Sequence, residues 1–254
     1  MFPLIIAHPN GPRGHRPRTT GILLVGFSLA LAAGCSNFAA QSKNAQGVQL
    51  YQQGQYQAAL REFQEATYTD PGNPDGYYNL AATYHRLGVI EKQQSYLDQA
   101  ENYYNQCLDH HPDHRECYRG LAVLLAEQDR KEEAFRLAEG WIERRPDSAD
   151  ARIELARLLE EFGDRSQAKE KLTEALTIEP NNPRALAALG KIREDMGEQA
   201  EALRNYQRSL SYDRFQPQLA SRVASLRATL GGGSSTTSPD SRTRLVDRQA
   251  APLR

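Results

Sequence analysis

The sequence predicts an all-α protein, an α-solenoid of about five helix-turn-helix repeats followed by a C-terminal capping helix. Three recurring features predict this fold. Prolines recur along the chain, and the last two intervals between them are both 34 residues long. An alanine stands twelve residues before each proline, and a glycine marks the turn before most of these alanines. The prolines are Pro71, Pro112, Pro146 and Pro180, the alanines are Ala59, Ala100, Ala134, Ala168 and, in a fifth unit, Ala202, and the turn glycines are Gly54, Gly88, Gly163 and Gly197.

The segment 149–182 illustrates how each unit folds. Ile153, Leu155 and Leu158 share one side of a first helix, and Leu172 and Ile178 share one side of a second. A single hairpin of this size cannot bury both apolar faces, so it requires neighbours built in the same way. The recurring alanines allow two helices to cross closely, and the glycines take the left-handed conformation that ends a helix.

This pattern resembles the tetratricopeptide repeat (TPR) family from about residue 41 to residue 230. The resemblance implies a right-handed superhelix in which the first helix of each repeat lines a concave groove. We expect repeats at about 41–73, 74–114, 115–148, 149–182 and 183–215, and a capping helix at 216–230. Asn73-Pro74 and Asn182-Pro183 predict helix starts, because asparagine caps and proline is tolerated in the first turn. Asp113 with Glu116 resembles a capping box.

The second repeat departs from the common period. The distance from Pro71 to Pro112 is 41 residues, which is seven more than the regular interval. We expect the extra residues between Val89 and Asp98, either as an early, projecting start of the second helix or as a longer loop. In the first case Ile90, Tyr96 and Leu97 lie on the projection and need a partner surface.

The first 34 residues predict a signal peptide. Three arginines precede an apolar run at 21–33, which is too short for a membrane span of ~20 residues. The run ends in LAAGCS at 31–36, which resembles the lipobox of bacterial lipoproteins, although Ala32 replaces the usual leucine. The resemblance implies lipidation of Cys35, a short tether at 35–40, and attachment to the outer membrane on its periplasmic face, since Ser36 follows the cysteine. The alternatives are an ordinary secretory signal and an uncleaved anchor.

The segment from Cys107 to Cys117 contains cysteines and histidines, which could form a disulfide or bind a metal ion. Each cysteine lies five residues from Pro112, so antiparallel helices joined there would hold the two at similar height. A disulfide is one interpretation, provided that the compartment is oxidising. A zinc or copper site with His110 and His114 is a second. The third is a pair of buried cysteines beside a polar turn. All three remain open at this point.

The composition of the whole chain and that of its C-terminal segment each support one further expectation. The chain is 39% apolar and 25% charged with a net charge of −1, which does not favour nucleic-acid binding. Residues 231–254 contain few apolar residues and no periodicity, so we expect a disordered tail.

The resemblance implies a non-enzymatic scaffold that binds a peptide or a partner helix. We find no phosphate loop, serine elbow or His-Glu-x-x-His motif, and we expect no cofactor and no nucleic-acid partner. The scaffold would serve pilus, secretion or cell-wall assembly on the bacterial cell envelope. The alternatives are a soluble cytoplasmic TPR adaptor and a metal-binding protein that uses the Cys107–Cys117 segment. The candidate groove residues are Asn79, Arg86, Arg119, Glu154, Arg157, Glu161, Arg184 and Lys191.

Overall fold

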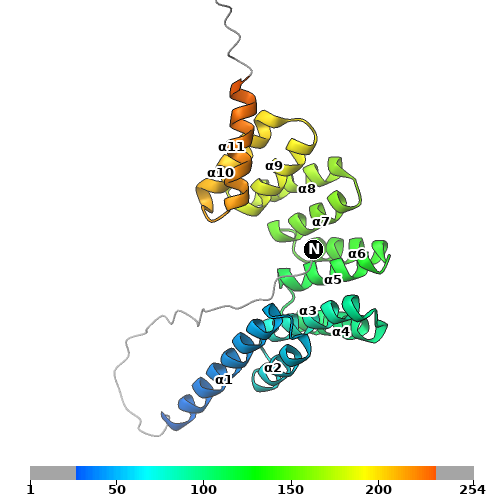
Figure 1. The fold of residues 1–254 in the computed structure, drawn as a ribbon, viewed down its shortest axis with the longest axis vertical. Coiled ribbons are helices and arrows are strands. Elements are labelled where there is room, and N and C mark those ends of the chain that lie inside the picture. The colour runs from blue at the N-terminus through cyan, green and yellow to red at the C-terminus, as the bar shows by residue number, and fades with distance from the viewer. Residues whose placement is uncertain (1–26, 233–254) are drawn as a thin grey trace, which may run out of the picture. The chain divides into compact units, whose positions relative to one another are not determined.

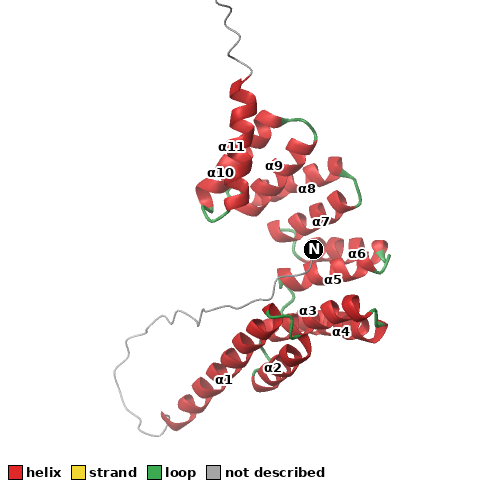
Figure 2. Cartoon of the chain, in the orientation of Figure 1, coloured by secondary structure: helices red, strands yellow, loops and turns green. Residues whose placement is uncertain are grey.

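The structure, a computed structural model, describes residues 27–232, with side chains from Phe38 to Gly231. This part of the chain is all-helical and contains eleven helices and no strand (Figures 1 and 2). The main part of the predicted signal peptide and nearly all of the predicted tail lie outside the described residues. Within 27–232, none of the helices combines the length and the apolar character that a membrane crossing requires.

The helices form hairpins within two compact units, Met1–Pro180 and Asn181–Arg254. In the first unit the described helices are α1 (Phe27–Gln52), α2 (Tyr56–Thr69), α3 (Pro74–Glu91), α4 (Gln94–His110), α5 (Arg115–Glu127), α6 (Lys131–Arg144), α7 (Ala149–Glu161) and α8 (Arg165–Ile178). The second unit contains α9 (Pro183–Asp195), α10 (Gln199–Tyr212) and α11 (Pro217–Gly232). Residues 35–40, expected as a tether, continue α1 because no proline or glycine interrupts them.

The recurring alanines lie where paired helices approach most closely. Ala59, Ala100, Ala134, Ala168 and Ala202 are all fully buried. Glycines on the first helices support the same close packing. A Cβ on Gly47 would lie 2.5 Å from the Phe63 ring, and one on Gly190 would lie 2.5 Å from the Tyr206 ring. The period of the sequence therefore reflects contacts that tolerate no larger side chain.

Three of the four glycines predicted to be the left-handed residue of an inter-helix turn have that role, and the prediction for the fourth was wrong. Gly54, Gly163 and Gly197 have φ values of 76°, 89° and 82°, in the left-handed region. Gly88 lies inside α3, where a Cβ would come within 2.4 Å of Leu97. The left-handed residue of this hairpin is Lys92, with a φ of 54°. Gly88 is therefore a packing position, because the inserted residues carry α3 past it.

The seven inserted residues of the second repeat are shared between both helices of the hairpin. α3 is five residues longer than α5, and α4 is three residues longer than α6, while the turn between them is one residue shorter. The end of α3 leaves Ile90 49% exposed. Together with Tyr56, Ala58 and Leu87 it lines an open pocket of about 530 Å³ beside the start of α2. The insertion is thus helical, but it lengthens α3 more than α4.

Candidate functional site

The first helices of successive hairpins form a continuous inner layer in the first unit. α1 packs on α3, α3 on α5, and α5 on α7, whereas α2, α4 and α6 each pack mainly on the hairpin partner and on the helix that follows (Figure 1). The candidate groove residues of this unit belong to α3, α5 and α7 of this layer.

Polar pairs in which one member is fully buried join the helices of this inner layer. The Asn79 amide of α3 donates to the Asn44 side-chain oxygen of α1 at 2.7 Å, and Asn79 is fully buried. Between α3 and α5, His85 Nε2 lies 2.9 Å from Glu127 Oε2. The hydrogen bond to His85 lowers the pKa of Glu127 below its usual value. These contacts fix the register of neighbouring helices, because buried polar groups cost free energy when they lack partners.

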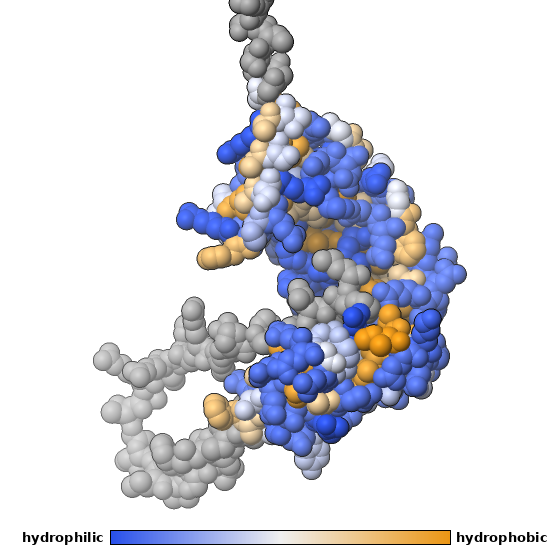
Figure 3. Space-filling view, in the orientation of Figure 1, coloured by the Kyte–Doolittle hydropathy of each residue, from blue (hydrophilic) through white to orange (hydrophobic). Residues whose placement is uncertain are grey.

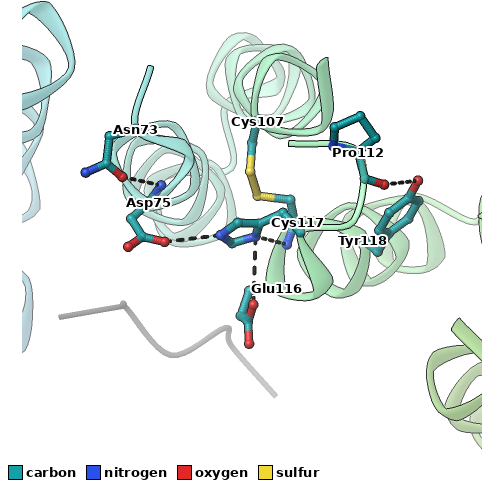
Figure 4. Close-up of a disulfide and its surroundings, with 8 residues drawn as sticks. Asn73, Asp75, Cys107, Pro112, Glu116, Cys117 and Tyr118 are labelled. Carbon is teal, nitrogen blue, oxygen red and sulfur yellow. Dashed lines mark hydrogen bonds and ion pairs between the residues drawn. A yellow bond between two sulfur atoms is a disulfide. The ribbon is translucent and has the colours of Figure 1, made fainter. Parts of the chain in front are cut away.

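A second cluster lies where α4 meets α5. A disulfide joins Cys107 near the end of α4 to Cys117 in the first turn of α5, with Cα atoms 6.4 Å apart (Figure 4). Both cysteines are fully buried. The N-cap of α5 is His114 rather than Asp113, since His114 Nδ1 accepts a hydrogen bond from the Cys117 N–H at 3.2 Å. Asp113 instead pairs with Arg145 and accepts from the Trp141 ring nitrogen.

His114 is held from both sides of its ring. Its Nε2 lies 3.1 Å from Asp75 Oδ1 of α3, and its Nδ1 lies 3.8 Å from Glu116 Oε2. Because Nδ1 accepts from a backbone N–H, the ring proton belongs on Nε2, where Asp75 accepts it. His110, the other histidine expected at this cluster, turns away and stacks on Tyr77 at 4.7 Å. Of the alternative metal ligands predicted from the sequence, only Cys107, His114 and Cys117 lie together, with ligand atoms within 4.8 Å of one another.

Three family models match the chain in succession. All three describe tetratricopeptide repeats, and they cover residues 47–88, 91–149 and 149–192. The chain contains tetratricopeptide repeats. The hairpins α1–α2 to α7–α8 are therefore TPR units, and such repeats suggest a protein-interaction scaffold. No curated protein matches the sequence.

The chain is similar to several solved structures. A thermophilic TPR protein of Thermus thermophilus is 28% identical over 74% of this chain and 98% of its own, with a TM-score of 0.55. Pseudomonas aeruginosa pilF is 17% identical over 79% of this chain and 95% of its own, with a TM-score of 0.49. YrrB, a TPR protein with an unusual peptide-binding site, is 16% identical over 79% of this chain and 98% of its own, with a TM-score of 0.41.

The predicted groove residues on this TPR inner layer differ in what they can offer to a partner. Asn79 and Glu154 are buried, and Asn79 already donates to Asn44. Arg157 bridges two carboxylates of its own helix, Glu154 at 3.2 Å and Glu161 at 3.0 Å. Arg119 of α5 is exposed, and among the described residues no carboxylate pairs with it. Arg119 is therefore the guanidinium most available to a bound chain.

The remaining predicted groove residues lie elsewhere. Arg86 of α3 reaches back to α2, where its Nε donates to the Tyr56 hydroxyl at 3.3 Å. Arg184 and Lys191 belong to α9 in the second unit, where Lys191 lies 3.6 Å from Asp195. We therefore do not group Arg184 and Lys191 with the residues of α3, α5 and α7.

Sequence reasoning missed three partners in this layer, namely Asn44, His85 and Glu127. A polar residue at a position where the helix period expects an apolar one was the available signal, and His85 occupies such a position in α3. The pairing itself spans 42 residues of sequence, so no local pattern reveals it. Cys35, the predicted lipidation site, lies within the backbone of α1, but its side chain is outside the described residues, so lipidation stays a prediction.

Proposed function

We propose that this TPR protein is a non-enzymatic scaffold that binds a peptide or a partner helix along the inner layer of α3, α5 and α7. A lipid on Cys35 would hold it on the bacterial cell envelope, on the periplasmic face of the outer membrane, where it would serve pilus, secretion or cell-wall assembly. The repeats support the scaffold, and the LAAGCS segment at 31–36 supports the anchor.

The observation that supports the binding proposal is the exposed Arg119, in a layer in which other polar side chains form hydrogen bonds and ion pairs with one another. Its neighbours on the same stripe of α5 include Val123, which is 9% exposed, and Glu127, which is tied to His85. A planar guanidinium with free donors can take a carboxylate or backbone carbonyls of an extended chain. The surrounding residues are already held by pairs within the layer, so binding would order few additional side chains and would lose little entropy.

The surface drawn in Figure 3 agrees with a binding role. The face drawn in Figure 3 is mostly hydrophilic, with apolar residues in separate patches. The histidines of the inner layer and the cysteine cluster, His85 and His114, are both buried and paired with carboxylates of neighbouring helices. Each pair joins two neighbouring helices and so contributes to the fold.

Charge reversal of Arg119 tests the groove. A partner recovered with the wild-type chain from crosslinked membranes would be identified, and its affinity measured by calorimetry. Arg119→Glu should weaken binding by about tenfold or more, which corresponds to about 1.4 kcal/mol or more. Arg136→Glu is the matched control, because Arg136 is also exposed but lies on α6, outside the inner layer. Helicity by circular dichroism should not change in either variant. Equal affinity of Arg119→Glu and wild type would reject the groove.

Metabolic labelling tests the anchor. A palmitate analogue should label the wild-type chain and not a Cys35→Ala variant, and the variant should leave the membrane fraction while remaining folded. A soluble cytoplasmic adaptor, the alternative, would show neither labelling nor a change in fractionation.

A further inference from the structure

A buried cluster of two sulfurs and one imidazole has no role in the proposed scaffold. Its atoms are Cys107 Sγ, Cys117 Sγ and a ring nitrogen of His114, which all lie within 4.8 Å of one another. The three side chains are buried, at 0%, 0% and 8% exposure. We propose that reduction of the Cys107–Cys117 disulfide converts this cluster into a zinc-binding site.

The ligand types and their spacing suit zinc. Two thiolates and an imidazole are the ligands of Cys₂His zinc sites, which complete their tetrahedron with a further group. Zinc–sulfur bonds of ~2.3 Å and zinc–nitrogen bonds of ~2.0 Å place tetrahedral ligand atoms ~3.3–3.8 Å apart. The widest separation in the cluster must therefore close by only about 1 Å. The helix ends that carry the two cysteines already stand 6.4 Å apart at their Cα atoms.

The carboxylate that contacts His114 is placed as in metal sites. Asp75 Oδ1 lies 3.1 Å from Nε2, so the ring proton points toward the carboxylate. This contact leaves Nδ1 as the nitrogen with the free lone pair, and a carboxylate on the distal nitrogen is the usual partner of a zinc-bound histidine. Nδ1 now accepts the Cys117 N–H at 3.2 Å, and zinc would take over that lone pair.

Glu116 lies beside the ring nitrogen of His114 that would bind zinc. Its Oε2 lies 3.8 Å from His114 Nδ1, whereas Asp75 lies at the other ring nitrogen, Nε2 (Figure 4). Arg115 now holds the other carboxylate oxygen of Glu116, Oε1, so Oε2 is the oxygen that faces the imidazole. The two sulfurs and the imidazole would take a further group as the fourth ligand, either a water or Glu116 once its side chain turned toward the sulfurs.

The conversion balances with a dithiol as reductant. The dithiol gives two electrons and two protons to the Sγ–Sγ bond, which breaks into two thiols, while the dithiol becomes a disulfide. Zinc then displaces the two thiol protons, which pass to solvent. An oxidising compartment favours the disulfide and a reducing one favours the zinc form, so the zinc form arises only where a dithiol reductant reaches the chain. Zinc binding by the purified chain can be tested apart from the scaffold function.

Zinc uptake by the full-length chain tests the site. The protein is reduced with a phosphine, freed of reductant without air, and titrated with zinc against a chromophoric chelator. The reduced chain should bind one zinc per molecule, and the oxidised chain none. Cobalt in place of zinc should give a thiolate-to-cobalt charge-transfer band and the strong visible bands of a tetrahedral ion.

Variants separate the site from adventitious binding. Cys107→Ser/Cys117→Ser should abolish uptake. His114→Asn should weaken it strongly while keeping the helix cap, because Asn73 and Asn182 cap α3 and α9 at the matching position. Asp75→Asn should weaken affinity about 10- to 100-fold. His110→Asn and Cys35→Ala are controls and should bind as wild type. Uptake that survives the serine pair, or that falls equally in His110→Asn and His114→Asn, would overturn the proposal.

Discussion

Two turn residues hold backbone conformations that glycine adopts at less cost. Lys92 and Asp129 have φ values of 54° and 60°, while Gly163 occupies the equivalent position of the fourth hairpin at 89°. The left-handed region costs an ordinary residue about 1–2 kcal/mol, partly offset by the larger entropy that glycine has in the unfolded chain. Asp129→Gly should therefore raise the free energy of unfolding by about 0.5–1 kcal/mol. Urea denaturation would measure it.

The reverse change provides the control for this prediction. Gly163→Ala should lower the free energy of unfolding by about 1 kcal/mol, since its Cβ meets no other atom and only the backbone conformation is strained. If both variants shift stability in the same direction, backbone strain does not govern these turns.

Tyr104 is a buried phenol whose hydroxyl has no hydrogen-bond partner among the residues that the structure describes. Its ring is fully buried between α4 and α5, and burial raises the pKa of its hydroxyl well above the usual value. An unsatisfied buried hydroxyl costs about 1–3 kcal/mol, so Tyr104→Phe should be neutral or stabilise the protein by about 1 kcal/mol. Thermal unfolding at matched pH would measure the change.

The ring itself must remain in place. A Cβ on Gly120 would lie 2.4 Å from Tyr104 Cε1, so Gly120→Ala should destabilise the protein by about 1–3 kcal/mol. A stable Gly120→Ala variant would show that the ring is not confined at this crossing.

At the scale of the elements, the disulfide is the covalent link between two successive hairpins. Cys107 and Cys117 close a loop of ten residues between α4 and α5. Closing a loop of this size lowers the conformational entropy of the unfolded chain, which raises the free energy of the unfolded state by about 2–3 kcal/mol. Cys107→Ala/Cys117→Ala should lower the free energy of unfolding by about that amount. The free energy of unfolding of the oxidised wild type should exceed that of its metal-free reduced form by a similar amount.

Hydrogen exchange would localise this effect. Amides of α4 and α5 should exchange faster in the alanine pair, while amides of α7 and α8 should change little. Uniform acceleration across the first unit would mean that the link stabilises the whole array rather than one junction.

At the scale of the whole molecule, each helix is stabilised mainly by the helices that pack directly against it. In the second unit α11 covers α10 through Leu219, Val223 and Leu226, which contact Ala202 and Tyr206. Each buried aliphatic side chain contributes about 1.5–3 kcal/mol, so a chain that ends at Gln216 should lose several kcal/mol from this unit. Hydrogen exchange should accelerate in α9 and α10 and stay unchanged in α1 to α4. Unaltered exchange in α10 would show that α11 is not a cap.

The sequence by itself determined the repeat architecture of this protein. The intervals between prolines, the fully buried alanines and the caps Asn73 and Asn182 were predictable because they depend on residues within one hairpin. Contacts across hairpins required the tertiary structure. Only the folded chain places Asn44 against Asn79 and His114 between Asp75 and Cys117. The same reason explains why Lys92 replaces Gly88 as the turn residue: the insertion lengthens α3, and packing against Leu97 decides where the helix continues.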